Sequence, residues 1–227
     1  MADSHEAYRQ YAASDMYQAL SHFMFRTSPE LAQALHRGDY HRDMCDIMAE
    51  LGFGADEAGE LTRSLAADAF SPTSADDLFH ALRKDYTHLF SNPKISVMTP
   101  YESRFLGHEE GKSGQEVPLG TVVVEVARAY EEAGFTVEGT PPERGDHMGV
   151  ELSFMQVLRK NLGCMIDEGD DERGREVEGA IQGFLDRHLG VWGVAFFNAI
   201  AEKAEGDVYR AIGAIGVAFL ERELRQA

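Results

Sequence analysis

Two pairs of acidic and histidine residues have a spacing that could supply metal ligands. Asp77 precedes His80 by three residues, and Asp85 precedes His88 by three residues. Dimetal carboxylate bundles use such pairs on two helices and add a glutamate from each of two more. Here both pairs fall on one predicted helix, so they do not build that cage. A metal-dependent enzyme in a helical bundle, with iron, manganese or zinc, stays an alternative hypothesis.

A further acid–histidine group follows a stretch rich in glycine and proline. His147 and Glu151 are four residues apart and share a helical face, and Asp146 directly precedes them. Two ligands make a weak metal site, so a hydrogen bond or an ion pair is the preferred interpretation. Asp146 suits a helix cap, but the Asp146–His147 pair also suits a polar group in a cleft between two bundles. Because histidine charges near neutrality, His147 could make binding at such a site pH-sensitive.

The segment Gly107–Ser113 resembles a phosphate-binding loop. It is one residue short, because three residues instead of four separate its glycines. Glu109 and Glu110 lie inside it, and their charges would repel a phosphate. The segment is therefore predicted to be a surface turn.

The charge of the chain restricts its partners. The 21 basic and 39 acidic residues give a formal net charge of -18. Such a surface repels nucleic acid phosphates and anionic lipid headgroups, and it attracts basic ligands such as an arginine-bearing peptide. The sequence therefore predicts no nucleic acid partner and no stable insertion into a membrane.

Cysteine usage and the N-terminal residues indicate a cytoplasmic protein. Cys45 and Cys164 lie far apart and form no paired motif, which argues against a disulfide framework or a zinc knuckle. The first residues lack the basic-then-apolar order of a signal peptide, and no apolar run reaches the ~20 residues that span a bilayer. We expect a soluble protein of the cytoplasm that needs no cofactor.

Helical periodicity dominates the sequence and predicts an all-α fold. Apolar residues recur at spacings of three and four in most segments. Ser28, Asp56 and Ser74 are expected N-terminal caps, and Gly38 is an expected helix end. The predicted helices cover residues 7–25, 31–36, 40–51, a segment after Asp56, 74–90, 121–134, 147–166, 172–188, 192–200 and 207–225.

Two stretches interrupt the helical pattern. Residues 91–117 contain prolines and glycines and are predicted to be a long irregular segment. Residues 135–146 are the predicted hinge between an N-terminal helical subdomain, residues 1–134, and a C-terminal one, residues 147–227. A hinge of this kind permits either a monomer or a dimer that exchanges subdomains.

Three stretches in order resemble the TorD/DmsD/NarJ family of redox-enzyme maturation chaperones. Leu82–Phe90 is similar to the family's Tyr-x-x-Leu-Phe helix end, and Pro100–Ser103 follows it at the family's interval. Pro142–Met155 resembles the Glu-x-x-Asp-His stretch after the family's hinge. Phe184–Trp192 resembles its His-Leu-x-x-Trp turn. One residue departs from the pattern, since Gly145 stands where the family usually has proline.

The resemblance covers roughly residues 78–225. It implies two helical bundles joined by a hinge and a chaperone that catalyses nothing. Its partners would be the catalytic subunit of a molybdenum-cofactor oxidoreductase and that subunit's twin-arginine signal peptide. The chaperone would hold its client in the cytoplasm until the cofactor is inserted. A purely structural subunit of a cytoplasmic complex is a third hypothesis.

The resemblance also suggests which residues face the peptide. Aromatic members of the set would bury the apolar stretch of the peptide. Acidic members, namely Glu102, Asp146 and Glu151, are candidates for contacts with its arginines. The full predicted peptide-binding set is Tyr86, Leu89, Phe90, Pro100, Tyr101, Glu102, Ser103, Asp146, His147 and Glu151.

Overall fold

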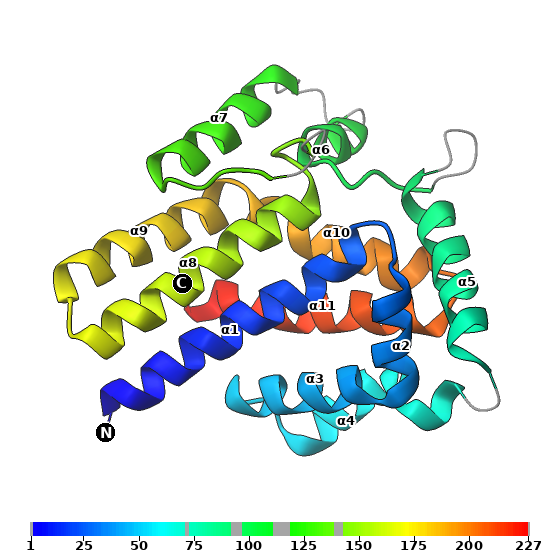
Figure 1. The fold of residues 1–227 in the computed structure, drawn as a ribbon. Helices are drawn as coiled ribbons and strands as arrows, with labels where there is room; N and C mark the ends of the chain where they lie inside the picture. The colour runs from blue at the N-terminus through cyan, green and yellow to red at the C-terminus, as the bar shows by residue number, and fades with distance from the viewer. Residues whose placement is uncertain (1, 71–72, 92–96, 111–118, 139–142, 227) are drawn as a thin grey trace.

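A computed structural model describes residues 2–70, 73–91, 97–110, 119–138 and 143–226. Regular secondary structure in these ranges is helical, and a single isolated bridge is the only β pairing there (Figure 1). The all-α prediction is confirmed. The α-helices are α1 (Ala2–Met24), α2 (Pro29–Arg37), α3 (Asp39–Glu50), α4 (Ala55–Thr62), α5 (Ala75–Tyr86), α6 (Glu102–Glu110), α7 (Leu119–Glu132), α8 (Met148–Glu168), α9 (Asp171–Arg187), α10 (Leu189–Lys203) and α11 (Asp207–Gln226).

Short turns of other helix types extend two of the α-helices. The 3₁₀ segments Arg63–Leu65 and Ala67–Phe70 follow α4. The π-helical segment Thr87–Ser91 continues α5. None of the helices in the described ranges is both long and apolar enough to cross a membrane.

Helices α1 and α8 pack against each other in antiparallel directions (Figure 1). Glycines on α8 permit this close approach. A Cβ atom at Gly149 would lie 2.7 Å from the ring of Phe25, just after the end of α1, and one at Gly163 would lie 2.7 Å from Tyr11. The first helix of the chain is therefore fitted to the helix that follows the predicted hinge.

Buried apolar residues from both sides of the predicted hinge belong to one cluster. Leu20 and Phe23 of α1 contribute to it, together with Phe154 of α8 and Trp192 of α10. Burial of such large side chains is the main stabilising contribution to a fold of this kind. The division into subdomains at residues 135–146 stays a prediction.

Local helix signals agree with the structure at three of the four predicted positions. The Ser28 and Ser74 hydroxyls accept hydrogen bonds from the first turns of α2 and α5. Gly38 ends α2 in the left-handed conformation, with φ 76°. The fourth prediction is wrong, because Gly54 precedes α4 and Asp56 lies inside its first turn. There the acidic side chain complements the helix dipole instead of capping the helix.

The prediction of an irregular segment over residues 91–117 is wrong for α6, which occupies Glu102–Glu110. The phosphate-loop-like segment Gly107–Ser113 begins inside this helix, and its residues 111–113 lie outside the described residues. In the predicted hinge, residues 135–138 and 143–144 are not helical, and residues 139–142 also lie outside the described residues.

Candidate functional site

Two backbone segments far apart in the sequence join at the start of α6 and the start of α8. The N–H of Glu102 donates to the carbonyl of Asp146 at 2.8 Å. The N–H of Met148 donates to the carbonyl of Pro100 at the same distance. We call these two segments, residues 100–103 and 144–148, the junction. It connects the segment after α5 to the end of the predicted hinge.

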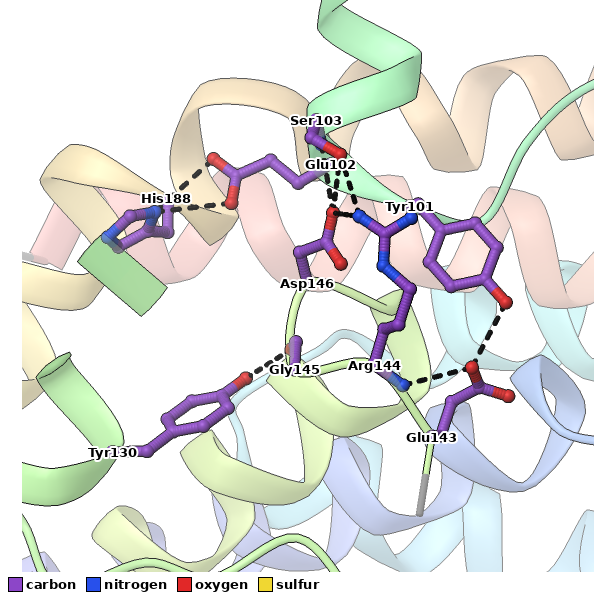
Figure 2. Close-up of polar contacts among 9 residues, drawn as sticks. All are labelled: Tyr101, Glu102, Ser103, Tyr130, Glu143, Arg144, Gly145, Asp146 and His188. Carbon is purple, nitrogen blue, oxygen red and sulfur yellow. Dashed lines mark hydrogen bonds and ion pairs between the residues drawn. The ribbon is translucent and has the colours of Figure 1, made fainter. Parts of the chain in front are cut away.

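The Asp146 carboxylate is the centre of the junction (Figure 2). It is fully buried, and its Oδ2 accepts from the Ser103 hydroxyl at 2.6 Å and from the Ser103 N–H at 3.4 Å. Arg144 Nη2 donates to the same oxygen at 3.0 Å and to the Ser103 hydroxyl at 3.2 Å. The other oxygen, Oδ1, is buried without a hydrogen-bond partner among the described residues. Asp146 therefore binds a cation of its own chain and retains one unused acceptor.

Tyr101 forms the half-exposed edge of the junction. Its ring meets the His147 ring edge to face, with centroids 5.2 Å apart, and its hydroxyl donates to Glu143 Oε1 at 3.0 Å. The guanidinium groups of Arg104 and Arg144 lie over the ring, 5.4 and 4.9 Å from its centre. Partial burial and the bond to Glu143 raise the pKa of Tyr101 to about 12. The ring is thus an aromatic platform that already attracts arginine.

His147 is a structural residue of the junction. Its Nδ1 accepts from the Gly149 N–H at 3.1 Å and caps α8, so the alternative that Asp146 caps this helix is wrong. Its ring stacks on Phe25 with centroids 5.4 Å apart. Burial lowers the pKa of His147 to about 4, although Glu143 and Asp146 oppose the shift. The imidazole is therefore neutral at pH 7, which argues against the hypothesis of a histidine that titrates near neutrality.

Glu102 in the junction and Glu151 on α8 bind residues from the third family-like stretch. Glu102 Oε2 lies 3.2 Å from His188 Nδ1, and Trp192 Nε1 donates to Glu151 Oε2 at 3.0 Å. All four side chains are buried. Burial raises the pKa of Glu151 well above its usual value, and the Glu102 and Asp146 carboxylates add to the shift. His188 and Trp192 were absent from the predicted set, although the stretch that contains them was recognised.

Gly145, the departure from the family pattern, touches α7. The Tyr130 hydroxyl donates to the Gly145 carbonyl at 2.8 Å (Figure 2). A Cβ atom at position 145 would lie 3.3 Å from Cε2 of Tyr130, closer than most such contacts. The absence of a side chain at this position therefore lets α7 close over the junction.

The aromatic end of α5 is connected to the junction through the backbone. The N–H of Met98 donates to the carbonyl of Leu89 at 3.2 Å, which directs the chain toward Pro100. Tyr86 and Phe90 are half-buried and pack edge to face at 5.3 Å. Burial raises the pKa of Tyr86, and the nearby Glu143 carboxylate adds to the shift. The first and second family-like stretches thus lie together in space.

Exposure divides the ten predicted residues into two groups. The buried group consists of Leu89, Pro100, Glu102, Ser103, Asp146, His147 and Glu151. The half-buried group consists of Tyr86, Phe90 and Tyr101. Three aromatic rings are therefore available to a partner without rearrangement, and most of the buried group holds the junction together. The role of the set in peptide binding stays a prediction.

The possible metal ligands have other roles where the structure describes them. Asp85 accepts hydrogen bonds from the N–H groups of Glu205 and Gly206, at 3.0 and 2.9 Å, just before α11 begins. Among the described residues, no three or more histidine, cysteine, aspartate or glutamate side chains converge as metal ligands. The pairs Asp77–His80 and Asp85–His88 are thus not assembled with further ligands in this part of the chain.

Comparison with known proteins assigns the family. Searches of curated proteins and of solved structures found no significant match. The family model described as "Nitrate reductase delta subunit" matches residues 53–198. This range is more than half of the chain, and it contains both segments of the junction together with His188 and Trp192. The chain therefore belongs to the nitrate reductase delta subunit family, a family of molybdoenzyme maturation chaperones.

Proposed function

We propose that the protein is a cytoplasmic chaperone that binds the twin-arginine signal peptide, the apo form, or both, of a molybdenum-cofactor oxidoreductase. Binding would delay export of the client until its cofactor is inserted, and it requires no catalysis. The observation that carries this proposal is the family match, because it spans every residue of the junction. The chain's net charge of -18 supports a basic ligand.

The junction offers a specific mode of arginine recognition. Arg144 already occupies the place that a client arginine would take, because it binds Asp146 and lies over the Tyr101 ring. The side chain of Arg144 is 41% exposed, whereas that of Asp146 is fully buried. The arginine can therefore swing into solvent while the carboxylate stays in place. A client guanidinium would then form the same charge-assisted bonds and the same cation–π contact.

The other two acidic residues have a different role in this proposal. Glu102 faces His188, and Glu151 accepts from Trp192, so each has an internal partner. Both side chains are buried. We assign them to positioning, since their contacts with His188 and Trp192 hold the starts of α6 and α8. The contacts of the peptide's apolar stretch with Tyr86 and Phe90 complete the proposed site.

Calorimetric titration tests the proposal. The titrant is the twin-arginine signal peptide of a molybdoenzyme encoded in the same genome, and the control is the same peptide with both arginines replaced by lysine. Lysine cannot reproduce the planar bidentate contact, so the control should bind about tenfold more weakly. Absence of binding by the arginine peptide would refute signal-peptide recognition.

Variants test separately whether a client arginine replaces Arg144 at the junction. Tyr101→Ala removes the aromatic platform and should weaken peptide binding about tenfold. Arg144→Met removes the internal competitor and should strengthen binding. Unchanged affinity in both variants would place the peptide elsewhere on the chaperone, even if the peptide binds the unaltered protein.

A further inference from the structure

A groove of about 800 Å³ lies between α1, α2 and α3, and Phe25 is one of its lining residues. These helices are neighbours in Figure 1, and α1 and α3 pack directly against each other. The volume is at the upper end of the range of ligand sites in proteins, ~300–1,000 Å³. The groove contains no residue of the predicted peptide-binding set.

The floor of the groove is apolar and only partly covered by the chain itself. Phe25, Leu31 and Ile47 line it and are half-buried, whereas Met44, which also lines it, is buried. Half-buried apolar side chains that share one concave surface leave area that a partner can remove from water. The groove therefore offers hydrophobic binding energy to an apolar ligand.

The rim of the groove is acidic. Asp15, Glu30, Asp43 and Asp46 are exposed along it, and Arg26 is the one arginine among its lining residues. In the part of the chain that the structure describes, none of these four carboxylates forms a salt bridge. Their charge is thus available to a cationic partner.

Asp39, an acidic residue near the groove, differs from the rim carboxylates because it forms salt bridges. Asp39, at the start of α3, binds both Arg37 and Arg42, at 3.0 and 2.6 Å. Arg37 and Arg42 are therefore directed to a residue outside the groove lining. Among the described residues, neither arginine forms a salt bridge with the four rim carboxylates.

The groove adjoins the junction through a single aromatic contact. The ring of Phe25 lines the groove and also stacks on the ring of His147. His147 in turn meets the ring of Tyr101. A ligand bound in the groove would therefore lie one aromatic layer away from the edge of the junction.

We propose that the groove between α1, α2 and α3 is a docking site for an apolar peptide segment with flanking basic residues. The occupant is the signal segment of the client, so this inference rests on the proposed function. The apolar stretch of the peptide extends from Tyr86 and Phe90 into the groove, where it covers Phe25, Leu31 and Ile47. The arginine that replaces Arg144 stays at Asp146, and the other basic residues of the peptide lie against the carboxylates of the rim.

A charge-reversal experiment tests the groove. The variant is Asp43→Lys/Asp46→Lys, and the matched control is Glu131→Lys/Glu176→Lys, which makes the same change in net charge at exposed positions of α7 and α9. The probe is a fluorescein-labelled synthetic peptide with an arginine pair before a leucine–alanine stretch. The groove variant should bind this peptide about tenfold more weakly than the control does at low salt. Added salt should reduce the difference.

A steric variant gives an independent measurement. Ala34 lines the groove and is half-buried, so Ala34→Trp should fill the groove and lower affinity without changing any charge. Thermal unfolding checks that this variant is folded, and the charge-reversal variant alters only exposed side chains. The two variants should act in the same direction.

The possible failures are distinguishable. If the unaltered protein binds the peptide and both groove variants bind it equally well, the groove inference is wrong and the proposed function stands. If the unaltered protein binds no peptide, both the groove inference and the proposed function fail. If sedimentation shows that the groove variants abolish self-association and leave peptide affinity unchanged, the occupant is a second copy of the chain and the inference is overturned.

Discussion

Trp192 on α10 donates a hydrogen bond from its indole nitrogen to Glu151 on α8, with 3.0 Å between Nε1 and Oε2. Both side chains are fully buried. The second oxygen of Glu151 is buried without a partner among the described residues, and Glu102 and Asp146 lie near enough to repel a negative charge. Burial without a second partner and the nearby carboxylates therefore favour the neutral form of the Glu151 carboxyl group.

The raised pKa of Glu151 predicts how stability depends on pH. The folded state keeps a proton that the unfolded state releases near the ordinary glutamate pKa of 4.5, so this residue lowers the free energy of unfolding as pH rises above 4.5. Glu151→Gln cannot ionise and still accepts from Trp192. The variant should be more stable than the unaltered protein at pH 7, and the gain should vanish as pH falls to 4.5.

Chemical denaturation from pH 4.5 to 8 measures this effect. Glu151→Ala is the control, because it removes the ionisable group and also leaves the Trp192 N–H without an acceptor. Loss of a buried hydrogen-bond partner costs about 1–3 kcal/mol, so the alanine variant should be less stable than the glutamine variant at every pH. A glutamine variant less stable than the unaltered protein at pH 8 would show that Glu151 is ionised in the fold.

Sequence patterns predicted those features whose cause lies within a few residues. Ser28 and Ser74 cap helices by bonds to N–H groups three positions later, and Gly38 ends α2 because glycine tolerates a positive φ. Such signals are visible without knowledge of the fold. They explain why the all-α prediction and most helix positions are confirmed.

The junction depends on contacts that no local pattern encodes. Asp146 binds Ser103, 43 positions earlier, and this partner cannot be found from spacing. Because the sequence contained an aspartate just before a helix, a cap was a reasonable local interpretation. In the structure Asp146 binds Ser103 instead, and His147 caps α8. Likewise α6 was missed because prolines and glycines around residues 102–110 outweighed the helix formers within that stretch.

His147 provides a second prediction on pH, of opposite sign to that of Glu151. Burial lowers its pKa from the ordinary histidine value of 6.5 to about 4 in the fold, so the unfolded state binds the extra proton between these values. The residue therefore stabilises the fold less as pH decreases from 6.5 to 4. His147→Asn keeps a good cap but loses the stacking on Phe25 and does not titrate. The variant should be less stable at pH 7, and the deficit should shrink toward pH 4.

Thermal unfolding of the His147→Asn variant and of the unaltered protein at matched pH values measures this difference in stability. A deficit that stays constant from pH 7 to pH 4 would contradict a depressed histidine pKa. Ser28→Asn, which exchanges the cap of α2 without any titratable group, is the control and should show a difference independent of pH in this range.

Asp146 and Arg144 should differ strongly in their effect on stability. Asp146→Ala removes a buried carboxylate that accepts three hydrogen bonds from Ser103 and Arg144, and it should cost about 3 kcal/mol. Arg144→Met removes a half-exposed partner and should cost less than about 1 kcal/mol. Chemical denaturation compares the two, and hydrogen exchange at the Ser103 amide should accelerate only in the aspartate variant. Equal losses would mean that the ion pair, and not the bonds to Ser103, holds the junction.

Glycines in two helices should respond oppositely to alanine. A Cβ atom at Gly213 on α11 would lie 2.5 Å from the backbone nitrogen of Ala201 and 2.8 Å from the carbonyl oxygen of Phe197. Backbone atoms cannot rotate away as a side chain does, so Gly213→Ala must separate α10 from α11 and should cost about 3 kcal/mol. Gly179 on α9 has nothing within 4 Å of its Cβ position, so Gly179→Ala should stabilise by about 1 kcal/mol through helix propensity alone. Denaturant titration of both variants measures the contrast, and a Gly213→Ala protein as stable as the unaltered chain would show that α10 and α11 are not in contact at this point.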